Sequence, residues 1–394
     1  MNDWLPYYLG FSFCYGIGPL KFKLLKARLK NIREAYEAPK DILGELLGSH
    51  LAEKFLAFRS KFDYEKVIKK INEKNIKVIV QEDAAFPEAL RNISDPPICL
   101  YVRGDISLLV ADSVTREYSS RCEVLRPAPQ SASRANPSHF VPPATIFFAI
   151  VGTRKPTSYG IQVAKKFAGE LANAGFIIVS GMAMGIDTIA HRAALDAGQK
   201  TIAILGCGVD IIYPAVNTSL YWEIIKSGGV ILSEFPPGHT VLPGLFIARN
   251  RLISGLSRGV LVAEGLEDSG SLITARYAAE QGKDVFAPPS PITSAMSAAP
   301  NLLIKEGARL VTSVEDIMAE FGLKMSPRKK QEITVNLPNE EKNIFDLLEA
   351  TAKTTDEIIE QSHLAVESVL NTLSLLELKG AVEKNSEGKY QIKI

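Results

Sequence analysis

The chain has 394 residues, more than one compact core usually organises, so a large central domain with smaller domains attached is expected. Hydrophobic residues make up 46% of it and charged residues 23%, which is ordinary globular usage and excludes wholesale disorder. The formal net charge is +1, so an anionic partner must be met by a local basic patch and not by the field of the whole molecule.

The cysteines and the apolar runs bear on the compartment. Cys14, Cys99, Cys122 and Cys207 are far apart, which favours reduced, buried thiols in a cytosolic protein over a disulfide framework or a zinc site. The apolar run ATIFFAIVG is far shorter than the roughly 20 residues of a spanning helix. The amino terminus lacks a basic leader and a small-residue cleavage site. We therefore expect a cytoplasmic protein with no membrane span.

Residues 1–75 predict a small helical (SAM-like) domain. Apolar stripes with helical spacing, such as LKFKLLKARL and LAEKFLAFRS, are broken at GIGP and GSH. The GIGP turn at 16–19 has two interpretations. A helix-hairpin-helix would offer its backbone N–H groups to phosphate, but a bare turn between two helices is favoured, so no DNA binding is assigned to it.

Two segments separate this domain from the centre of the chain. Residues 76–109 predict a strand, a short helix and another strand that lead toward the central domain. Residues 110–144 have no sustained period and are rich in Pro, Ser and Ala. They predict a disordered insertion, in which we find no chemistry.

Residues 145–322 alternate apolar strands with helices. The strands are IFFAIVG, FIIVS, TIAILG, GVILSE, GVLVAEG, DVFAP and RLVT. Continuous apolar strands separated by helices are typical of a parallel sheet covered on both faces. The pattern therefore predicts a doubly wound, Rossmann-like α/β domain. Its ligand should lie beyond the carboxyl ends of the strands, where helix amino termini point their free N–H groups.

Residues 323–331 form a basic linker, and residues 332–394 predict three helices and a two-stranded wing, the order of a winged helix. From Gln331 to Ile394, 6 Lys and no Arg face 12 Asp and Glu, a formal charge of −6. That negative charge opposes the binding of a polyanion such as DNA. The winged helix is therefore expected to contact protein, which also disfavours a transcription regulator that would use it on DNA.

Glycine, arginine and serine gather in the turns where the topology puts the ligand. Gly152, Arg154 and Ser158 follow the first strand, and the later strands run into SGMAMGIDTIAH, GCGVDIIYP and SEFPPGHTVLPGLFIARNRLIS. Glycine lets a backbone approach an anion closely, and helix-start amides and guanidinium forks donate to phosphate oxygens. The turns indicate a phosphate-rich ligand. Neither G-x-G-x-x-G nor a phosphate-loop signature is present, so no dinucleotide or ATP cofactor is expected.

Three polar positions in this domain allow more than one interpretation. Asp187 and His191 stand four apart on one helical face and could be metal ligands or an acid–base pair. The favoured interpretation is that Asp187 caps the helix start and His191 bonds to it. Asn250 either caps or positions its neighbours Arg249 and Arg251, or the three residues form a solvated, charged helix start. Glu264 is a lone carboxylate, so no catalytic or metal-binding residue is assigned.

In this order, the turns VGTRKPTSYG, SGMAMGIDTIAHRAAL, LGCGVDIIYP, SEFPPG, ARNRLISGLS, LVAEGLEDSGSLITARYAAEQG and NLLIKEGA closely resemble the bacterial DNA-processing protein A family, also called Smf. The resemblance covers about Phe147 to Phe321, with weaker agreement in the front domain and the winged helix. It implies a Rossmann-like domain that binds single-stranded DNA without catalysis and protects incoming DNA. It also implies a homodimer that helps load the RecA recombinase during natural transformation.

The resemblance makes Arg154 a contact to the DNA backbone, with Ser158 completing an Arg-x-x-x-Ser pattern. The DNA-binding residues expected from the turns and the resemblance together are Gly152, Thr153, Arg154, Ser158, Ser180, Gly181, Met184, Gly185, Phe246, Arg249, Asn250, Arg251, Gly270 and Ser271.

The chain departs from the family pattern in three places, one of which is the insertion at 110–144. TVLPGLF lacks a lysine before the aromatic residue, so Phe246 either stacks a base or plugs the core. Pro289 and Ala299-Pro300 replace glycines that the family usually shows.

The rival hypothesis is an enzyme similar to the nucleoside-monophosphate phosphoribohydrolases, which share this layout. Those enzymes have a PGGxGTxxE turn with a catalytic glutamate, where this chain reads EGLEDSGSLITARYAAE. The glycine pair and the threonine–glutamate spacing are missing. The binding protein is therefore the leading hypothesis and the enzyme the alternative.

Overall fold

The computed structural model describes residues 3–110, 146–323, 339–348, 352–362, 364–378, 381–384 and 388–392. The chain forms two compact units, Met1–Lys324 and Met325–Ile394. Nearly all of the predicted insertion at 110–144 and of the linker at 323–331 lies outside the described residues.

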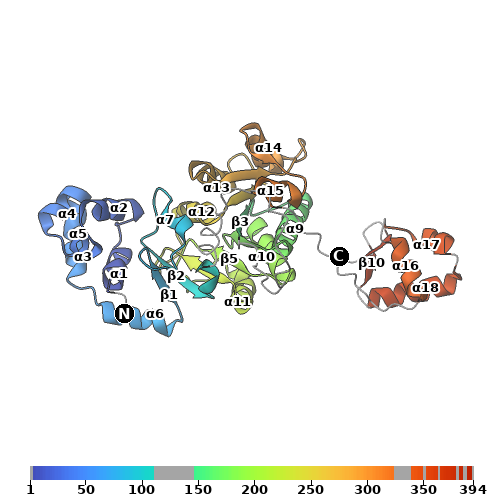
Figure 1. Ribbon diagram of the computed structural model, residues 1–394, viewed down its shortest axis with the longest axis horizontal. Coiled ribbons are helices and arrows are strands. Elements are labelled where there is room, and N and C mark those ends of the chain that lie inside the picture. The colour runs from blue at the N-terminus through green and yellow to red at the C-terminus, as the bar shows by residue number, and fades with distance from the viewer. Residues whose placement is uncertain are drawn as a thin grey trace, which may run out of the picture. The chain divides into compact units, whose positions relative to one another are not determined.

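A nine-stranded sheet organises the first unit (Figure 1). Its order is β1-β2-β6-β5-β4-β3-β7-β8-β9. Every pair from β6 to β9 is parallel, whereas β1 and β2 run antiparallel at one edge. The doubly wound α/β fold is therefore confirmed, and the two early strands join the same sheet. The strands are β1 (Lys77–Val80), β2 (Cys99–Gly104), β3 (Ile146–Val151), β4 (Phe176–Ser180), β5 (Thr201–Ile204), β6 (Val230–Ser233), β7 (Gly259–Val262), β8 (Asp284–Ala287) and β9 (Arg309–Leu310).

Helices cover both faces of this sheet, which is why its central strands are apolar without a break. All six residues of β3 are buried, and alternate ones enter different cores: Phe147 lies in one and Phe148 in another. One face packs against α7 (Glu88–Arg91), α12 (Pro243–Leu256), α13 (Gly270–Glu280) and α14 (Ala298–Lys305). The other packs against α9 (Ser158–Asn173), α10 (Ile186–Asp196) and α15 (Val314–Glu320).

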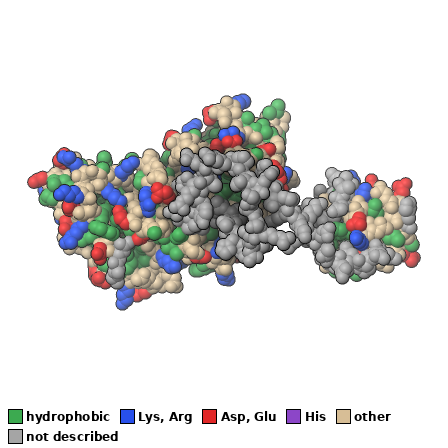
Figure 2. Space-filling view, in the orientation of Figure 1, with side chains coloured by type: hydrophobic (Ala, Val, Ile, Leu, Met, Phe, Trp, Pro, Cys, Tyr) green, Lys and Arg blue, Asp and Glu red, His purple; other side chains and the backbone are tan. Residues whose placement is uncertain are grey.

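Six helices precede the sheet and share a core with its β2, β5 and β6 strands and with α11 (Thr218–Lys226). They are α1 (Leu5–Phe13), α2 (Pro19–Arg28), α3 (Ile32–Glu37), α4 (Lys40–Leu47), α5 (Ser49–Arg59) and α6 (Tyr64–Glu73). Figure 2 shows Lys and Arg interspersed with Asp and Glu over their visible face. Such mixing produces no single-sign field.

The second unit has the predicted winged-helix order. Helices α16 (Asn339–Leu348), α17 (Thr355–Ser362) and α18 (Val366–Leu378) precede the hairpin of β10 (Val382–Lys384) and β11 (Tyr390–Ile392). Its core is separate from those of the first unit and contains residues of all three helices and of β10.

The structure also bears on the cysteines and on the apolar helices. Cys14, Cys99 and Cys207 are free, buried thiols, and Cys122 lies outside the described residues. Within the described ranges, no helix combines the length and the apolar character that crossing a bilayer requires.

Candidate nucleic-acid interface

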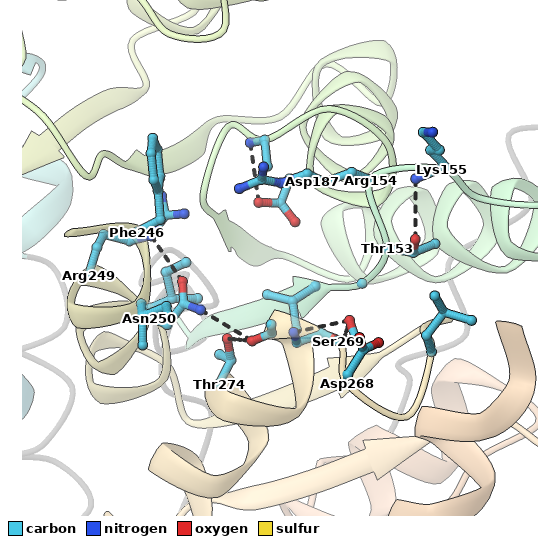
Figure 3. A pocket seen from close by; sticks show the side chains of 18 of the residues that line it. Thr153, Arg154, Lys155, Asp187, Phe246, Arg249, Asn250, Asp268, Ser269 and Thr274 are labelled. Carbon is cyan, nitrogen blue, oxygen red and sulfur yellow. Dashed lines mark hydrogen bonds between the residues drawn. The ribbon is translucent and has the colours of Figure 1, made fainter. Parts of the chain in front are cut away.

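A cavity of about 380 Å³ lies where β3, β4 and β7 end. Figure 3 shows Arg154 and Asp187 on one side of it, Phe246 and Asn250 on the α12 side, and Ser269 and Thr274 on α13 and the loop before it. Eight of the predicted DNA-binding residues line it: Gly152, Thr153, Arg154, Phe246, Arg249, Asn250, Gly270 and Ser271. The carboxyl edge of the sheet therefore holds a pocket where the topology expects one.

The loop after β4 packs tightly against the loop after β3. Ile186 N donates to Thr153 O at 3.1 Å, and Thr153 N donates to Glu264 O at 2.8 Å. Gly185 has φ +79°, and a Cβ there would collide with Thr153 O and with the backbone of Arg154. The glycine thus permits a close approach that fixes the turn carrying Arg154.

Arg154 and Lys155 are the exposed cations of the cavity. Within residues 3–110 and 146–323, neither side chain forms an ion pair. The Arg154 guanidinium carbon instead lies 5.7 Å from the centroid of the Phe246 ring. Lys155 N donates to Thr153 Oγ1 at 3.2 Å, which ties the two ends of the turn. Both cations therefore face solvent, ready for an anion.

Phe246 also lies near a second aromatic ring. Its centroid is 5.5 Å from that of Tyr213, with the planes inclined by 39°. Tyr213 comes from the loop after β5 and is 42% exposed. Phe246 is half-buried and lines the cavity. Phe246 is thus a neighbour of both Arg154 and Tyr213, and we call these three side chains the aromatic row (Arg154, Phe246 and Tyr213).

Arg249 borders the cavity but is only 4% exposed. Its Nη1 donates to Gly181 O at 2.7 Å and also to Ile204 O, and its Nε donates to Asn250 Oδ1 at 3.1 Å. Burial lowers the pKa of Arg249 to about 10, and the positive charge of Arg154 adds to this effect. Arg249 therefore ties the ends of β4 and β5 together, and Asn250 positions it.

Asp187 lies in the first turn of α10 but does not cap that helix as expected, because the N-cap is Gly185 and no side chain caps it; Asp187 instead binds the loop between β4 and α10. Its Oδ2 accepts from Gly181 N at 3.1 Å and from Ala183 N at 3.3 Å. Burial raises the pKa of this carboxyl, while Arg249 and the two amides oppose the rise. The expected Asp187–His191 bond is wrong, because His191 Nδ1 pairs with Thr201 Oγ1 at 2.7 Å. Thr201 Oγ1 in turn donates to Ile178 O at 2.6 Å.

Two predicted contacts are corrected by the structure, since both side chains are buried. Arg251 is 3% exposed, and its guanidinium pairs with Glu234 and Asp95. Ser180 is fully buried, and its Oγ donates to Ile150 O at 2.7 Å. Neither can reach a ligand without unfolding its surroundings, because buried charges and hydroxyls keep their partners. The two arginines of the RNR segment therefore point in different directions: Arg249 borders the cavity, and Arg251 points toward Glu234 and Asp95.

The remaining predicted residues lie outside the cavity lining. Gly181 packs against the Arg249 guanidinium, and Gly185 supports the Arg154 turn. Ser158, at the start of α9, and Met184 are exposed. These four stay predictions as DNA contacts.

The amino terminus of α13 forms the wall opposite Arg154. The N-cap Ser269 accepts from Ser271 N at 3.3 Å, and the two hydroxyls lie 2.8 Å apart. Asn250 Nδ2 donates to Gly270 O at 3.3 Å and so joins α12 to α13. The amide groups of this first turn carry the positive end of the helix dipole.

Glu264 has a structural role. Its carboxylate is 1% exposed and accepts from Thr157 N at 2.8 Å and from Thr157 Oγ1 at 2.5 Å. Glu264 therefore holds Thr157, the N-cap residue of α9, in place.

Four polar lining residues were missed by the sequence analysis: Lys155, Asp268, Ser269 and Thr274. Lys155 adjoins Arg154 and Ser269 opens the Ser-Gly-Ser turn, so both could have been found from their place in the turns. Asp268 carries no such signal, because a carboxylate is not expected in a cavity for anions.

The comparisons with known proteins agree with this architecture. The family model for DNA recombination-mediator protein A matches residues 141–322, and that for the DprA winged helix domain matches residues 328–388. A protein Smf of Synechocystis sp. is 32% identical over 426 residues, covering 99% of both chains. The DNA processing protein DprA of Streptococcus pneumoniae is 40% identical over 239 residues, covering 61% of this chain and 72% of that one.

A solved structure extends the likeness to three dimensions. The X-ray structure of DNA processing protein A from Streptococcus pneumoniae has a TM-score of 0.64 and 32% sequence identity, covering 81% of this chain and 98% of that one. Sequence, domain order and fold thus agree, and the chain belongs to the DNA recombination-mediator protein A family, the DNA-processing proteins called DprA or Smf.

Proposed function

We propose that the chain binds single-stranded DNA along the cavity at the end of β3, β4 and β7. The observation that carries this proposal is that Phe246 and Tyr213 lie near Arg154 and Lys155, two cations that form no ion pair within residues 3–110 and 146–323. Arg154 and Lys155 supply charge for the sugar-phosphate chain, and Phe246 and Tyr213 supply flat apolar surface. Sites of this composition hold single strands with little sequence preference from stacking.

A single strand fits this arrangement better than a duplex. Base faces in a duplex are already stacked on one another, whereas unpaired bases are free to stack on protein rings. Such stacking contributes about 1–3 kcal/mol per base, and phosphate contacts add a salt-dependent part. The first turn of α13, with Gly270 and Ser271, offers further backbone N–H groups to the bound strand.

The wider biological role rests on the family and not on the geometry. Family membership supports a homodimer in the cytoplasm that protects incoming single strands and helps load the RecA recombinase during natural transformation. We include these as parts of the proposal.

An oligonucleotide titration tests the binding function. A short oligothymidylate and a duplex of the same length are titrated with the full chain at two salt concentrations, with fluorescence anisotropy as the readout. Tighter binding of the single strand, weakening as salt rises, is expected. Equal affinity for the two forms, or no affinity for either, would refute the proposal.

The alternative enzyme makes a different chemical prediction. A nucleoside-monophosphate phosphoribohydrolase would release free base from nucleoside monophosphates. Incubation with each monophosphate, followed by chromatography of the products, separates the two hypotheses. The binding protein leaves every monophosphate intact.

A further inference from the structure

Of the two carboxylates that line the cavity, Asp187 is buried and accepts from two backbone amides, whereas Asp268 lies open to solvent. Asp268 is exposed, lines the cavity and belongs to the loop before α13. In Figure 3 it lies on the α13 side, and Arg154 lies on the opposite side. Across the ranges 3–110 and 146–323, Asp268 has neither an ion pair nor a hydrogen bond to the protein. Its oxygens are therefore free for a ligand.

Asp268 gives the α13 side of the cavity a negative charge, whereas Arg154 and Lys155 give the opposite side a positive charge. A phosphate placed beside Asp268 would be repelled, so the phosphates of a bound strand belong beside Arg154 and Lys155. A carboxylate accepts hydrogen bonds and donates none. The part of the strand that meets Asp268 must then donate hydrogen bonds. The sugar and phosphate groups within a DNA strand have no such donors, which leaves the edges of the bases.

The four bases differ in how well they can satisfy a carboxylate. Guanine presents two adjacent donors, N1–H and the N2 amino group, which match the two carboxylate oxygens as a bidentate pair. Adenine and cytosine offer one amino group beside a ring nitrogen that accepts, and thymine offers N3–H between two carbonyl oxygens. Both arrangements place an acceptor next to the carboxylate, which is unfavourable. Guanine is the best partner.

We propose that Asp268 is a base-reading residue that selects guanine in the bound single strand. This inference rests on the proposed function, because it assumes a strand in the cavity. The guanine edge that Asp268 reads is the Watson–Crick edge, which is available only when the base is unpaired. The same contact therefore strengthens discrimination against duplex DNA.

The experiment compares three strands with three proteins. The strands are an oligothymidylate, the same strand with guanine at every second position, and the same strand with hypoxanthine there instead, which lacks the N2 amino group. The proteins are the full chain, Asp268→Asn and Glu267→Gln. Glu267 is the neighbouring exposed carboxylate and does not line the cavity, so it controls for the loss of one negative charge.

The full chain and Glu267→Gln should bind the guanine strand about fivefold to a hundredfold more tightly than oligothymidylate. The hypoxanthine strand should lose most of that gain. In Asp268→Asn the preference should fall to about a fifth or less. Equal binding of guanine and thymine strands by the full chain, or an unchanged preference in Asp268→Asn, would overturn the inference.

The outcomes separate this inference from the proposed function. Tight binding of all single strands without base preference would leave the proposed function standing and remove the role of Asp268. Failure to bind any strand would remove both. An oligouridylate tests a further source of donors, the ribose 2′-hydroxyl. Two results together would show that Asp268 binds the ribose 2′-hydroxyl: oligouridylate binds more tightly than oligothymidylate, and guanine has no effect on affinity. The assignment of guanine would then be wrong.

Discussion

Arg251 and Glu234 form a buried bidentate ion pair that joins α12 to the end of β6. Arg251 Nη1 lies 2.5 Å from Glu234 Oε1 and Nη2 lies 2.7 Å from Oε2. The side chains are 4% and 7% exposed. Arg251 Nε also donates to Asp95 Oδ2 at 2.7 Å. Two carboxylates thus hold one guanidinium in place, so this arginine belongs to the framework that supports the cavity.

Replacing Arg251 should therefore affect folding. In Arg251→Met the carboxylate of Glu234 remains buried without its partner, which costs about 3–5 kcal/mol of unfolding free energy. Urea unfolding of the full chain measures this cost. Arg192→Met is the matched control, because Arg192 forms an exposed pair with Glu223 at 3.4 Å and should cost less than about 1 kcal/mol. Equal losses in the two variants would contradict the structural role.

Replacing Arg154 should weaken DNA binding and leave folding almost unchanged. Arg154→Ala should weaken binding of all single strands alike and reduce the slope of log affinity against log salt by about 0.7, because one phosphate contact is lost. Its unfolding free energy should change by less than about 0.5 kcal/mol, since the side chain is exposed. Arg192→Ala, an exposed arginine outside the cavity lining, should leave the salt slope unchanged. An unaltered affinity in Arg154→Ala would remove this residue from the site.

The aromatic row makes a prediction about Tyr213. Tyr213→Ala should weaken single-strand binding about fivefold to a hundredfold, because a stacked base contributes about 1–3 kcal/mol. Tyr213→Phe keeps the ring and should bind like the unchanged protein. The effects of Tyr213→Ala and Phe246→Ala should not add, since the two rings are in contact. Full affinity in Tyr213→Ala would show that the ring only supports Phe246.

Much of this fold can be predicted from the chain because its strands are buried on both faces. The run Ile146–Val151 is apolar at every position, which is typical of a central strand of a covered parallel sheet. Once the sheet is parallel, its carboxyl edge is the expected ligand side, so the order of strands and turns in the sequence is enough to place Gly152, Arg154 and Phe246 at one rim.

The roles of neighbouring polar residues could not be predicted in the same way. Arg249 and Arg251 both follow Phe246 on one helix, but the partner Asp95 of Arg251 is 156 positions away in the sequence. Local pattern contains no information on such a partner. The pairing of Phe246 with Tyr213 and that of His191 with Thr201 are likewise set by tertiary packing. Spacing predicts the element, and long-range contacts decide which side chain is free.

The acidic winged helix should contribute little to DNA affinity. Its formal charge of −6 over Gln331 to Ile394 repels phosphate, and its core is separate from those of the first unit. A chain ending at Lys324, the last residue of that unit, should bind oligothymidylate within about twofold of the full chain. Sedimentation of both proteins controls for a change in oligomeric state. A tenfold loss of affinity at equal oligomeric state would assign DNA contacts to the winged helix.

His191 should make the protein sensitive to mild acid. Burial lowers the pKa of His191 from 6.5 to about 3, so the folded chain keeps it neutral while the unfolded chain takes up a proton below about pH 6.5. Stability from this residue is therefore complete above that pH and is lost as the pH falls from about 6.5 toward 3. Between pH 7 and pH 5 the expected loss is about 2 kcal/mol.

The matched variant is His191→Asn, whose amide can still donate to Thr201 Oγ1 but does not titrate. Urea unfolding of both proteins at the two pH values gives the comparison. The decrease in unfolding free energy should be about 2 kcal/mol smaller in the variant than in the unchanged chain. Equal decreases would mean that His191 takes up its proton in the folded protein, and that its unpaired Nε2 reaches water or an acceptor when the pH falls.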